Sequence, residues 1–270
     1  MTLNATCASC DVRDTALCTS LADDELDRLA GLGVQRRLAR GDTLLRAGDP
    51  PVVCANIQAG VMKIAQVTPG GSEAIVGLLY PGDLVGRPFA GMSDHDVVAL
   101  TDVKLCAFPR AAFERVLGDH GRMERLLLER TMAELDRARR WLLRLGRASA
   151  LARVAGFLDD MSRRLAGPDG LMPGTTGASQ PFELPLSRGE MADLLGLTIE
   201  TVSRQMTRLK TAGIISLPGL RSVVVDASAY YHDNGRQRLS REPSSHQHQR
   251  QEEQEGQCPA KPHYLSIYLS

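Results

Sequence analysis

The sequence predicts an α+β protein with an N-terminal antiparallel β-roll, a long dimerisation helix and a C-terminal winged helix-turn-helix. Three observations predict this fold. Short apolar runs separated by Gly or Pro turns fill residues 34–108. A segment with few helix breakers and a heptad pattern of apolar residues follows over residues 111–147. Two capped helices joined by a glycine then stand between residues 187 and 213.

Length and composition allow a DNA-binding protein with more than one domain. The 270 residues are enough for two small domains with separate cores, and 43% of them are hydrophobic. Lysine plus arginine and aspartate plus glutamate each number 32, so the formal net charge is zero. The charge is unevenly spread, because acids gather at 23–27 and 252–255 and bases at 122–153. Neutrality therefore does not exclude DNA, since one domain alone can meet the phosphates.

The sequence also predicts where the protein acts and how its parts are ordered. No run of 18 apolar residues predicts a membrane span, and the first residues lack the pattern of a secretion signal. We therefore expect a cytoplasmic protein whose six cysteines are ligands or buried thiols rather than disulfides. The expected parts are a cysteine-rich segment (1–19), a sensor roll (20–118), the dimerisation helix (119–147), the winged helix-turn-helix (148–231) and a disordered tail (232–270).

The first two parts differ in texture. Residues 1–19 hold three cysteines and no apolar period, which predicts a loop held by something other than a core. Ser20 is expected to cap a short helix with Leu26, Leu29 and Leu32 on one face. In the roll, turns such as Arg40-Gly41-Asp42 separate the predicted strands. The clearest of these strands are Thr43–Leu45, Val61–Ile64, Ala74–Leu79 and Val97–Leu100.

The long helix carries a stripe of residues at alternating steps of three and four, the pattern that pairs two helices. The alternative is that this stripe packs on the protein's own roll. A second apolar set is available for that packing: Leu126, Leu127, Met132 and Leu143. We therefore predict a homodimer whose interface consists of Leu128, Thr131, Leu135, Ala138, Leu142 and Leu145.

After an amphipathic helix with Leu151, Val154, Leu158, Met161 and Leu165, the strongest local pattern is a helix-turn-helix. A capping box starts its first helix, a glycine ends that helix with a tight turn, and a threonine can cap the second helix, which is expected to run to Gly213. A small residue at the crossing, two buried contacts and a hairpin wing complete the pattern. The capping box is Ser187 with Glu190, the glycine is Gly196 and the capping threonine is Thr198. The small residue is Ala192, the buried contacts are Leu197 and Val202, and the wing is Ile214–Leu217 with Val223–Val225.

The second of these helices carries the candidate DNA contacts. Arg204 can pair bidentately with guanine, Glu200 can accept a hydrogen bond from cytosine, and Ser203 can contact either base type. Arg208 and Lys210 lie further along and suit phosphates. A solvated polar face is the alternative, but the preceding turn favours a DNA-binding helix pair. No nucleophile–base constellation supports an enzyme.

The N-terminal cysteines are candidate metal ligands. Thiolates are soft ligands for iron–sulfur clusters or zinc, and two residues between the first pair let both sulfurs reach one metal centre. Three ligands are incomplete, so a fourth must come from Cys54, Cys106 or Cys258, and Cys258 in the tail is the poorest candidate. The sequence alone does not separate the other two. The pattern C-x2-C-x7-C is formed by Cys7, Cys10 and Cys18.

Over residues 7–231 the chain resembles the FNR branch of the CRP/FNR regulator family. The resemblance rests on the N-terminal cysteines, on the turns Ala47-Gly48-Asp49 and Pro81-Gly82-Asp83 in the roll, and on the long helix. It also rests on the segment Leu197 to Arg204, in which Glu200, Ser203 and Arg204 are similar to the family's E-x-x-S-R recognition signature.

This resemblance implies a fold, a cofactor and partners. The roll would be of the cyclic-nucleotide-binding type. A 4Fe–4S cluster would hold the dimeric, DNA-binding form without oxygen, and oxygen would convert it to a 2Fe–2S form and weaken dimerisation. Cys106 would be the fourth ligand, because Cys106-Ala107-Phe108-Pro109 aligns with the family's cysteine near the end of the roll. The implied partners are RNA polymerase and a palindromic operator resembling TTGAT-N4-ATCAA.

Two departures from the family pattern bear on regulation. The gap between Cys10 and Cys18 is longer than in the enterobacterial members, although other relatives share it. Ala138 stands on the dimer seam where some relatives carry an acid. A carboxylate there would repel its mate and help to keep the oxidised form monomeric. Its replacement by alanine implies a dimer that depends less on the cluster.

Other signals stay open as alternatives. A cyclic nucleotide is disfavoured, because the roll lacks the Arg-Ser or Arg-Thr pair that holds a cyclic phosphate in nucleotide-binding relatives. Haem would need an axial ligand such as His95, zinc could occupy the cysteines, and a redox signal could act on them directly. Free thiols in a disordered N-terminus, or an iron–sulfur electron-transfer protein, are further alternatives. The helix-turn-helix argues against electron transfer.

Overall fold

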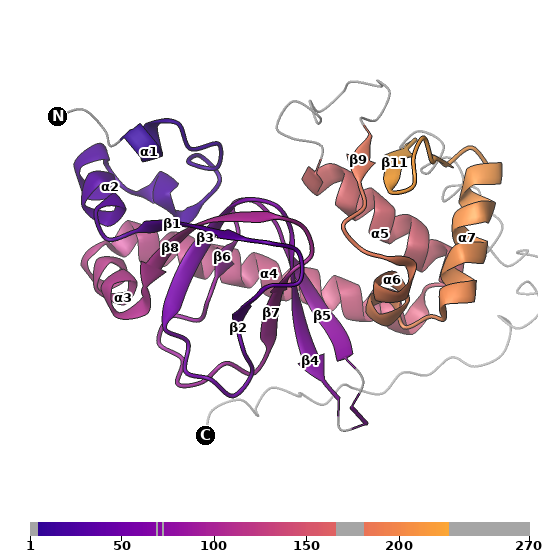
Figure 1. The fold of residues 1–270 in the computed structure, drawn as a ribbon, viewed down its shortest axis with the longest axis horizontal. Helices are drawn as coiled ribbons and strands as arrows, with labels where there is room; N and C mark the ends of the chain where they lie inside the picture. The colour runs from indigo at the N-terminus through magenta and orange to yellow at the C-terminus, as the bar shows by residue number, and fades with distance from the viewer. Residues whose placement is uncertain (1–4, 69, 72, 166–180, 227–270) are drawn as a thin grey trace, which may run out of the picture. The chain divides into compact units, whose positions relative to one another are not determined.

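The structure is a computed structural model that describes residues 5–68, 70–71, 73–165 and 181–226 (Figure 1). The predicted disordered tail and Cys258 lie outside the described residues. Among the described residues, no helix is both long enough and apolar enough to cross a membrane. The order of elements agrees with the predicted α+β fold, in which a roll precedes a long helix and a winged helix-turn-helix.

Two four-stranded antiparallel sheets make the roll, as predicted. The strand order is β1-β8-β3-β6 in one sheet and β2-β7-β4-β5 in the other. The apolar side chains between the sheets form a core that includes Ile57, Met62 and Leu105, all fully buried. The strands are β1 (Val34–Leu38), β2 (Thr43–Leu45), β3 (Val53–Ala59), β4 (Met62–Val67), β5 (Glu73–Leu79), β6 (Leu84–Val85), β7 (Asp96–Ala99) and β8 (Val103–Pro109).

The N-terminal segment differs from its prediction, because it shares a core with the roll. Leu17 and Leu21 pack in a buried cluster with Phe108 of β8 and Phe113 of α3. The segment therefore holds itself in place by burying apolar side chains, and no metal is needed to explain its order. Its elements are α1 (Ala5–Ala8), the 3₁₀ helix η1 (Leu17–Ser20) and α2 (Asp23–Ala30), and α3 (Arg110–Asp119) follows the roll.

The predicted cap at Ser20 is wrong. Helix α2 starts after Ala22, whose backbone N–H donates to the carboxylate of Glu25 at 2.7 Å. Ser20 instead ends η1, and its hydroxyl donates to the carbonyl of Leu17. Leu26 and Leu29 are buried as expected, whereas Leu32 lies beyond the end of the helix and is 42% exposed. The helix therefore has only the glutamate half of a capping box, because Ala22 has no side-chain oxygen to accept from the N–H groups of the first turn.

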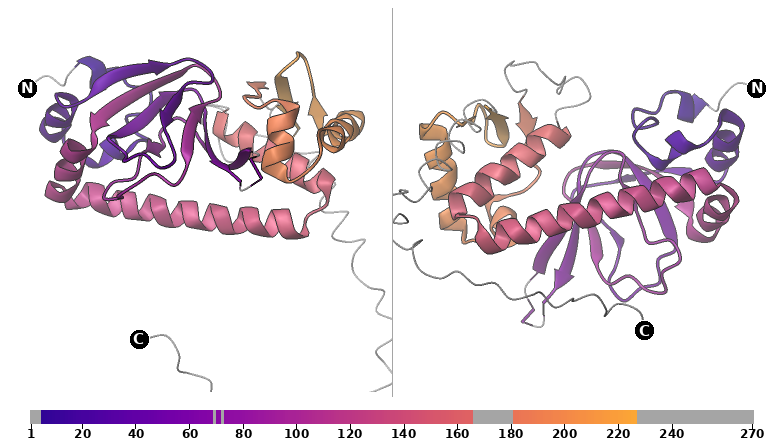
Figure 2. Two further views of the ribbon diagram at one scale, coloured as in Figure 1. Left: turned by 60° about the horizontal axis from the view of Figure 1, so that its bottom comes forward. Right: turned by 180° about the vertical axis from the view of Figure 1, so that it is seen from behind.

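A single long helix, α4 (Gly121–Arg147), follows the sensor roll (Figure 2). Only its Met123 is fully buried. Leu126 and Leu127 are partly buried against the cluster around Phe113, so half of the second apolar set packs inward as predicted. Met132 and Leu143, the other half, are 50% and 66% exposed and do not take part.

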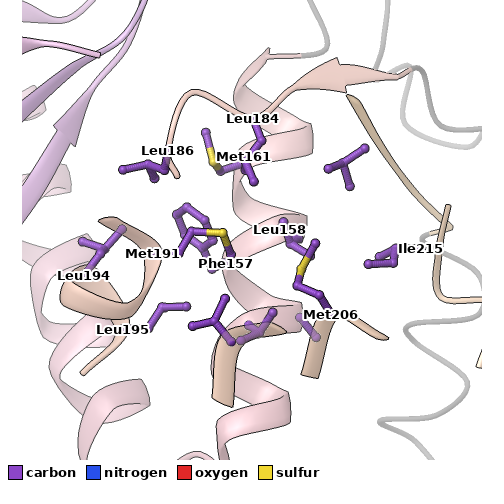
Figure 3. Packing of buried hydrophobic residues seen from close by; sticks show 14 of the residues in the cluster. Phe157, Leu158, Met161, Leu184, Leu186, Met191, Leu194, Leu195, Met206 and Ile215 are labelled. Carbon is purple, nitrogen blue, oxygen red and sulfur yellow. The ribbon is translucent and has the colours of Figure 1, made fainter. Parts of the chain in front are cut away.

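The C-terminal domain packs around the predicted amphipathic helix, and its buried cluster also takes in Val61, Ile75, Tyr80 and Leu100 of the roll, so the two domains do not have fully separate cores. Helix α5 (Ala150–Leu165) contributes Phe157, Leu158 and Met161, and α6 and α7 close over them (Figure 3). A three-stranded antiparallel sheet in the order β10-β11-β9 forms the wing, which was predicted as a hairpin of two strands. The remaining elements are β9 (Phe182–Glu183), α6 (Arg188–Leu195), α7 (Ile199–Thr211), β10 (Ile215–Ser216) and β11 (Ser222–Val225).

Candidate functional site

Four of the cysteines line one pocket between the N-terminal segment and the outer face of the roll. Cys7, Cys10 and Cys18 come from the N-terminal segment, and Cys106 comes from the middle of β8. Most of its other lining side chains are apolar, and no carboxylate of the described residues lines it. Its other lining residues are Val12, Arg13, Ala16, Leu26, Leu29, Ala30, Gln35, Asn56, Gln58 and Phe108.

Strand alternation explains why Cys106 faces this pocket. Successive side chains of a strand point to opposite faces of the sheet. Leu105 and Ala107 therefore enter the core inside the roll, whereas Cys106 and Phe108 lie on the outer face. In the register of the sheet, Cys106 pairs with Gln35 of β1 on one side and with Asn56 of β3 on the other. Two carboxamide side chains thus flank the sulfur of Cys106.

Cys54 lies on the same outer face of β3 but outside the pocket. It is fully buried in the cluster with Phe113 of α3. Burial raises the pKa of its thiol to about 12, and the nearest charges are those of Glu114 and Arg110 rather than other cysteines. Of the two candidates for the fourth ligand, the fold brings Cys106 to the N-terminal cysteines and keeps Cys54 apart.

Three of the pocket thiols, those of Cys7, Cys18 and Cys106, have a raised pKa. Burial raises the pKa of Cys18 to about 11 and that of Cys106 to about 12, and the neighbouring cysteines push both values further up. The pKa of Cys7 is also raised, first by burial and then by the proximity of Cys10. A thiolate in the pocket would therefore repel a second thiolate beside it. A bound cation would instead stabilise the thiolate forms and lower the pKa values of these cysteines.

The four sulfurs share a pocket without forming a ready site for one ion. Within the described ranges, no group of three or more His, Cys, Asp or Glu side chains is arranged to ligate a single metal ion. His95, the candidate haem ligand, does not line the pocket. It lies in the loop before β7, where its carbonyl accepts from the hydroxyl of Ser93.

Helix α4 contacts the cysteine-rich segment directly. The guanidinium of Arg130 donates to the carbonyl of Thr15, which lies between Cys10 and Cys18, and to the carbonyl of Gly82 at 3.2 Å. Gly82 has φ +91°, and a Cβ there would meet the hydroxyl of Thr15 at 2.9 Å, so a side chain would push this loop away. One arginine of α4 therefore bridges the cysteine loop and the turn between β5 and β6.

The rest of α4 presents an exposed apolar stripe. Leu128, Leu135 and Leu142 of the predicted interface are 57%, 42% and 68% exposed. Thr131 and Ala138 are also exposed, and Leu145 is half-buried. Contiguous exposed apolar surface on a protein commonly marks an interaction site.

The helix-turn-helix has the predicted local geometry. The hydroxyl of Ser187 accepts from the backbone N–H of Glu190 at 3.2 Å, and the Glu190 carboxylate accepts from the N–H of Ser187 at 2.7 Å. Gly196 has φ +60°, a left-handed conformation that glycine adopts without cost at a helix end. Thr198 caps α7 through the N–H of Thr201. The helix ends at Thr211, two residues before the predicted Gly213.

The predicted DNA contacts lie on the exposed side of α7. Glu200, Ser203, Arg204 and Arg208 are all exposed, whereas Val202 on the opposite side is fully buried. The pKa of Glu200 is lowered by a hydrogen bond from its own backbone N–H and by the hydroxyl of Thr198, so its carboxylate is ionised at neutral pH. Arg204 makes no ion pair with any residue in the described part of the chain.

Sequence reasoning missed several polar residues around the cysteines. Gln35, Asn56, Gln58 and Arg130 have no motif of their own, and each meets the cysteine-rich segment only after the chain has folded. Weak signals did exist. Asn56 interrupts an apolar run, and Arg130 lies one residue from the heptad position Thr131.

The comparisons with known proteins agree with this architecture. Residues 35–120 match the cyclic nucleotide-binding domain family, and residues 152–229 match the Crp-like helix-turn-helix domain family. A probable transcriptional activator of Rhizobium leguminosarum bv. viciae is 40% identical over 81% of this chain and 88% of its own length. The transcriptional activator protein FnrL of Cereibacter sphaeroides is 39% identical over 81% of this chain and 87% of its own length. The solved structure of FixK2 from Bradyrhizobium japonicum has a TM-score of 0.65 at 28% identity, over 74% of this chain and 96% of that one.

The fold, the helix-turn-helix and the relatives together define a DNA-binding transcription regulator, in which a β-roll precedes a winged helix-turn-helix. Its relatives are regulators of transcription and not enzymes. The chain belongs to the CRP/FNR family of transcription regulators.

Proposed function

We propose that this regulator responds to oxygen through a 4Fe–4S cluster held by Cys7, Cys10, Cys18 and Cys106. The cluster would favour a homodimer under low oxygen, and the dimer would bind a palindromic TTGAT-N4-ATCAA-like operator. One observation carries the proposal. Cysteines that lie far apart in the sequence line one pocket, and no carboxylate lines that pocket with them.

The residues of the pocket fit such a cofactor. Iron–sulfur clusters are held by four thiolates, and the pocket supplies four sulfurs within apolar walls. The cluster, when bound, would supply the oxygen-sensitive chemistry. The chain's own residues would bind it, exclude bulk water from it with side chains such as Leu26 and Phe108, and release protons from Cys18 and Cys106 on binding.

Arg130 supports a route from the pocket to the dimer helix. Its guanidinium bonds to the carbonyl of Thr15, which lies within the loop that joins Cys10 to Cys18. A second link joins α2 to the start of α4, because the Glu25 carboxylate accepts from Arg122 at 3.0 Å. A change in the cysteine loop would therefore shift the helix that carries the exposed stripe.

The exposed stripe and the α7 surface support the output of the switch. Burying Leu128, Leu135 and Leu142 against a second copy would remove apolar surface from water and place two copies of α7 side by side. Arg204 would read guanine, with Glu200 and Ser203 beside it, and Arg208 would contact phosphate. The relatives named as activators support a partnership with RNA polymerase in the cytoplasm.

An anaerobic preparation tests the proposal. Protein reconstituted with ferrous iron and sulfide should be brown, with a broad absorption band. It should contain about four irons and four sulfides per chain. The same sample should shift operator DNA without oxygen and lose most of that binding after exposure to air. A colourless protein that binds zinc or haem and shifts DNA equally in both conditions would contradict the proposal. It would favour a regulator that senses another signal.

A further inference from the structure

Two carboxamide side chains of β3 donate hydrogen bonds to sulfurs of the cysteine pocket. The Nδ2 of Asn56 lies 3.4 Å from the Sγ of Cys18, and the Nε2 of Gln58 lies 3.5 Å from the Sγ of Cys10. Both distances are within the range of hydrogen bonds to sulfur. Each of the two N-terminal thiols that these bonds reach therefore has one amide donor from the roll.

The sheet fixes where these donors lie. Ala55 and Ile57 of β3 point into the roll and are fully buried, so Asn56 and Gln58 point outward to the cysteine segment. Asn56 is also the direct cross-strand partner of Cys106. A rigid central strand thus carries both donors, whereas the sulfurs that they reach lie on the N-terminal segment.

The polar side chains of the pocket lining oppose the effect of burial, which disfavours negative charge on the sulfur of Cys18. Its polar side chains, apart from the cysteines, are one arginine and three carboxamides, which are Arg13, Gln35, Asn56 and Gln58. Amide N–H groups stabilise a thiolate more than a thiol, because a hydrogen bond to an ionised acceptor is stronger than one to a neutral acceptor.

Asn56 is costly for the fold alone. It is 2% exposed, and its Oδ1 is the one buried side-chain oxygen or nitrogen without a hydrogen-bond partner among the described residues. An unsatisfied buried group lowers stability, and an apolar residue of similar shape would avoid this cost. The Nδ2 contact with Cys18 is therefore the one polar interaction that accounts for an asparagine here.

We infer that Asn56 and Gln58 are positioning residues that stabilise negative charge on the sulfurs of Cys18 and Cys10 and so raise the reduction potential of the iron–sulfur group held there. This inference rests on the proposed function. Reduction adds one electron, and with it one negative charge, to the group, so amide donors stabilise the reduced form more than the oxidised form. Hydrogen bonds to sulfur are one of the factors that set such potentials.

The test compares single variants that remove one donor each. Asn56→Leu and Gln58→Met keep the approximate volume and delete the N–H groups. In an anaerobic redox titration of the reconstituted protein, each variant should lower the ratio of reduced to oxidised protein at a fixed potential by about tenfold, or ~59 mV for a one-electron couple. Gln35→Met is the matched control, because Gln35 lines the same pocket without a hydrogen bond to sulfur. Its potential should stay close to that of the wild-type protein.

A second readout separates this role from a structural one. Metal-free Asn56→Leu should unfold at the same denaturant concentration as the wild type or a higher one, because it removes an unsatisfied oxygen. If that variant does not fold, the half-buried Gln58 carries the test alone. Equal potentials in Gln58→Met and Gln35→Met, with full iron content in both, would overturn the inference and leave the proposed function standing. A wild-type protein that holds no iron would overturn both.

Discussion

The helix-turn-helix and the cysteine pocket are built in opposite ways. The surface of α7 that carries the predicted DNA contacts comes from one continuous stretch, fixed by the cap at Ser187, the turn at Gly196 and the cap at Thr198. The pocket is assembled from the N-terminal segment, β1, β3 and β8. In the first region each side chain that contacts DNA would add its own increment of binding free energy. In the second, the proposed cluster would need all four thiolates, so the loss of one cysteine should remove the whole cluster.

The largest effect is therefore expected in the pocket, at Cys106. Cys106→Ala should abolish the brown absorption and the bound iron, because three thiolates cannot complete the ligand set. Cys54→Ala is the matched control, since Cys54 is buried on the same face of the sheet but outside the pocket. Iron analysis after anaerobic reconstitution checks both variants. A full cluster in Cys106→Ala and none in Cys54→Ala would reverse the assignment of the fourth ligand.

A large effect is also expected on the stripe of α4. Leu135→Glu should leave an unpaired carboxylate buried in the dimer, at a cost of several kcal/mol, and should yield monomers in anaerobic sedimentation. Val67→Glu is the control, because Val67 is an exposed apolar residue of β4 outside the stripe. Dimers in both variants would mean that the stripe is not the interface.

A smaller and base-specific effect is expected on α7. Arg204→Ala should cost ~1–3 kcal/mol of discrimination at the guanine of each half-site, and a symmetric dimer loses it twice. Arg208→Ala should instead weaken all sequences alike. Titration against operators altered at the guanine separates these outcomes. If Arg204→Ala lowers affinity uniformly and keeps the guanine preference, Arg204 contacts phosphate rather than a base.

The smallest effect is expected at Arg130, which links the cysteine-rich segment to helix α4. Coupling between two sites is typically about 1–3 kcal/mol, and Arg130→Met should remove about 1 kcal/mol of it. The variant should keep its iron, while dimer dissociation constants measured with and without oxygen should move closer together. Arg125→Met is the matched control, since Arg125 is exposed on α4 and pairs with Glu129 on the same helix. An unchanged oxygen response in Arg130→Met would show that the signal takes another route.

The local geometry of the helix-turn-helix could be predicted almost completely from the residue order. Both caps, the left-handed glycine and the buried Val202 follow from interactions between residues a few positions apart. Such interactions are present in the residue order, because helix caps and helical periodicity are local. Three of the roll's strands, β2, β5 and β7, were placed within one residue of their ends for the same reason, since turn residues mark them, whereas β4 runs three residues beyond its predicted end.

The surroundings of the cysteines, by contrast, follow from long-range packing and strand register. The N-terminal segment showed no apolar period, yet Leu17 and Leu21 join a core that is completed by Phe108 and Phe113. The choice between Cys54 and Cys106 depended on which part of the outer face each sulfur meets, and both have the same polarity and burial tendency in the sequence. Asn56 and Gln58 likewise gained their contacts with Cys18 and Cys10 only when strand register placed them beside the pocket. Register and packing join residues far apart in the chain, so no local pattern encodes them.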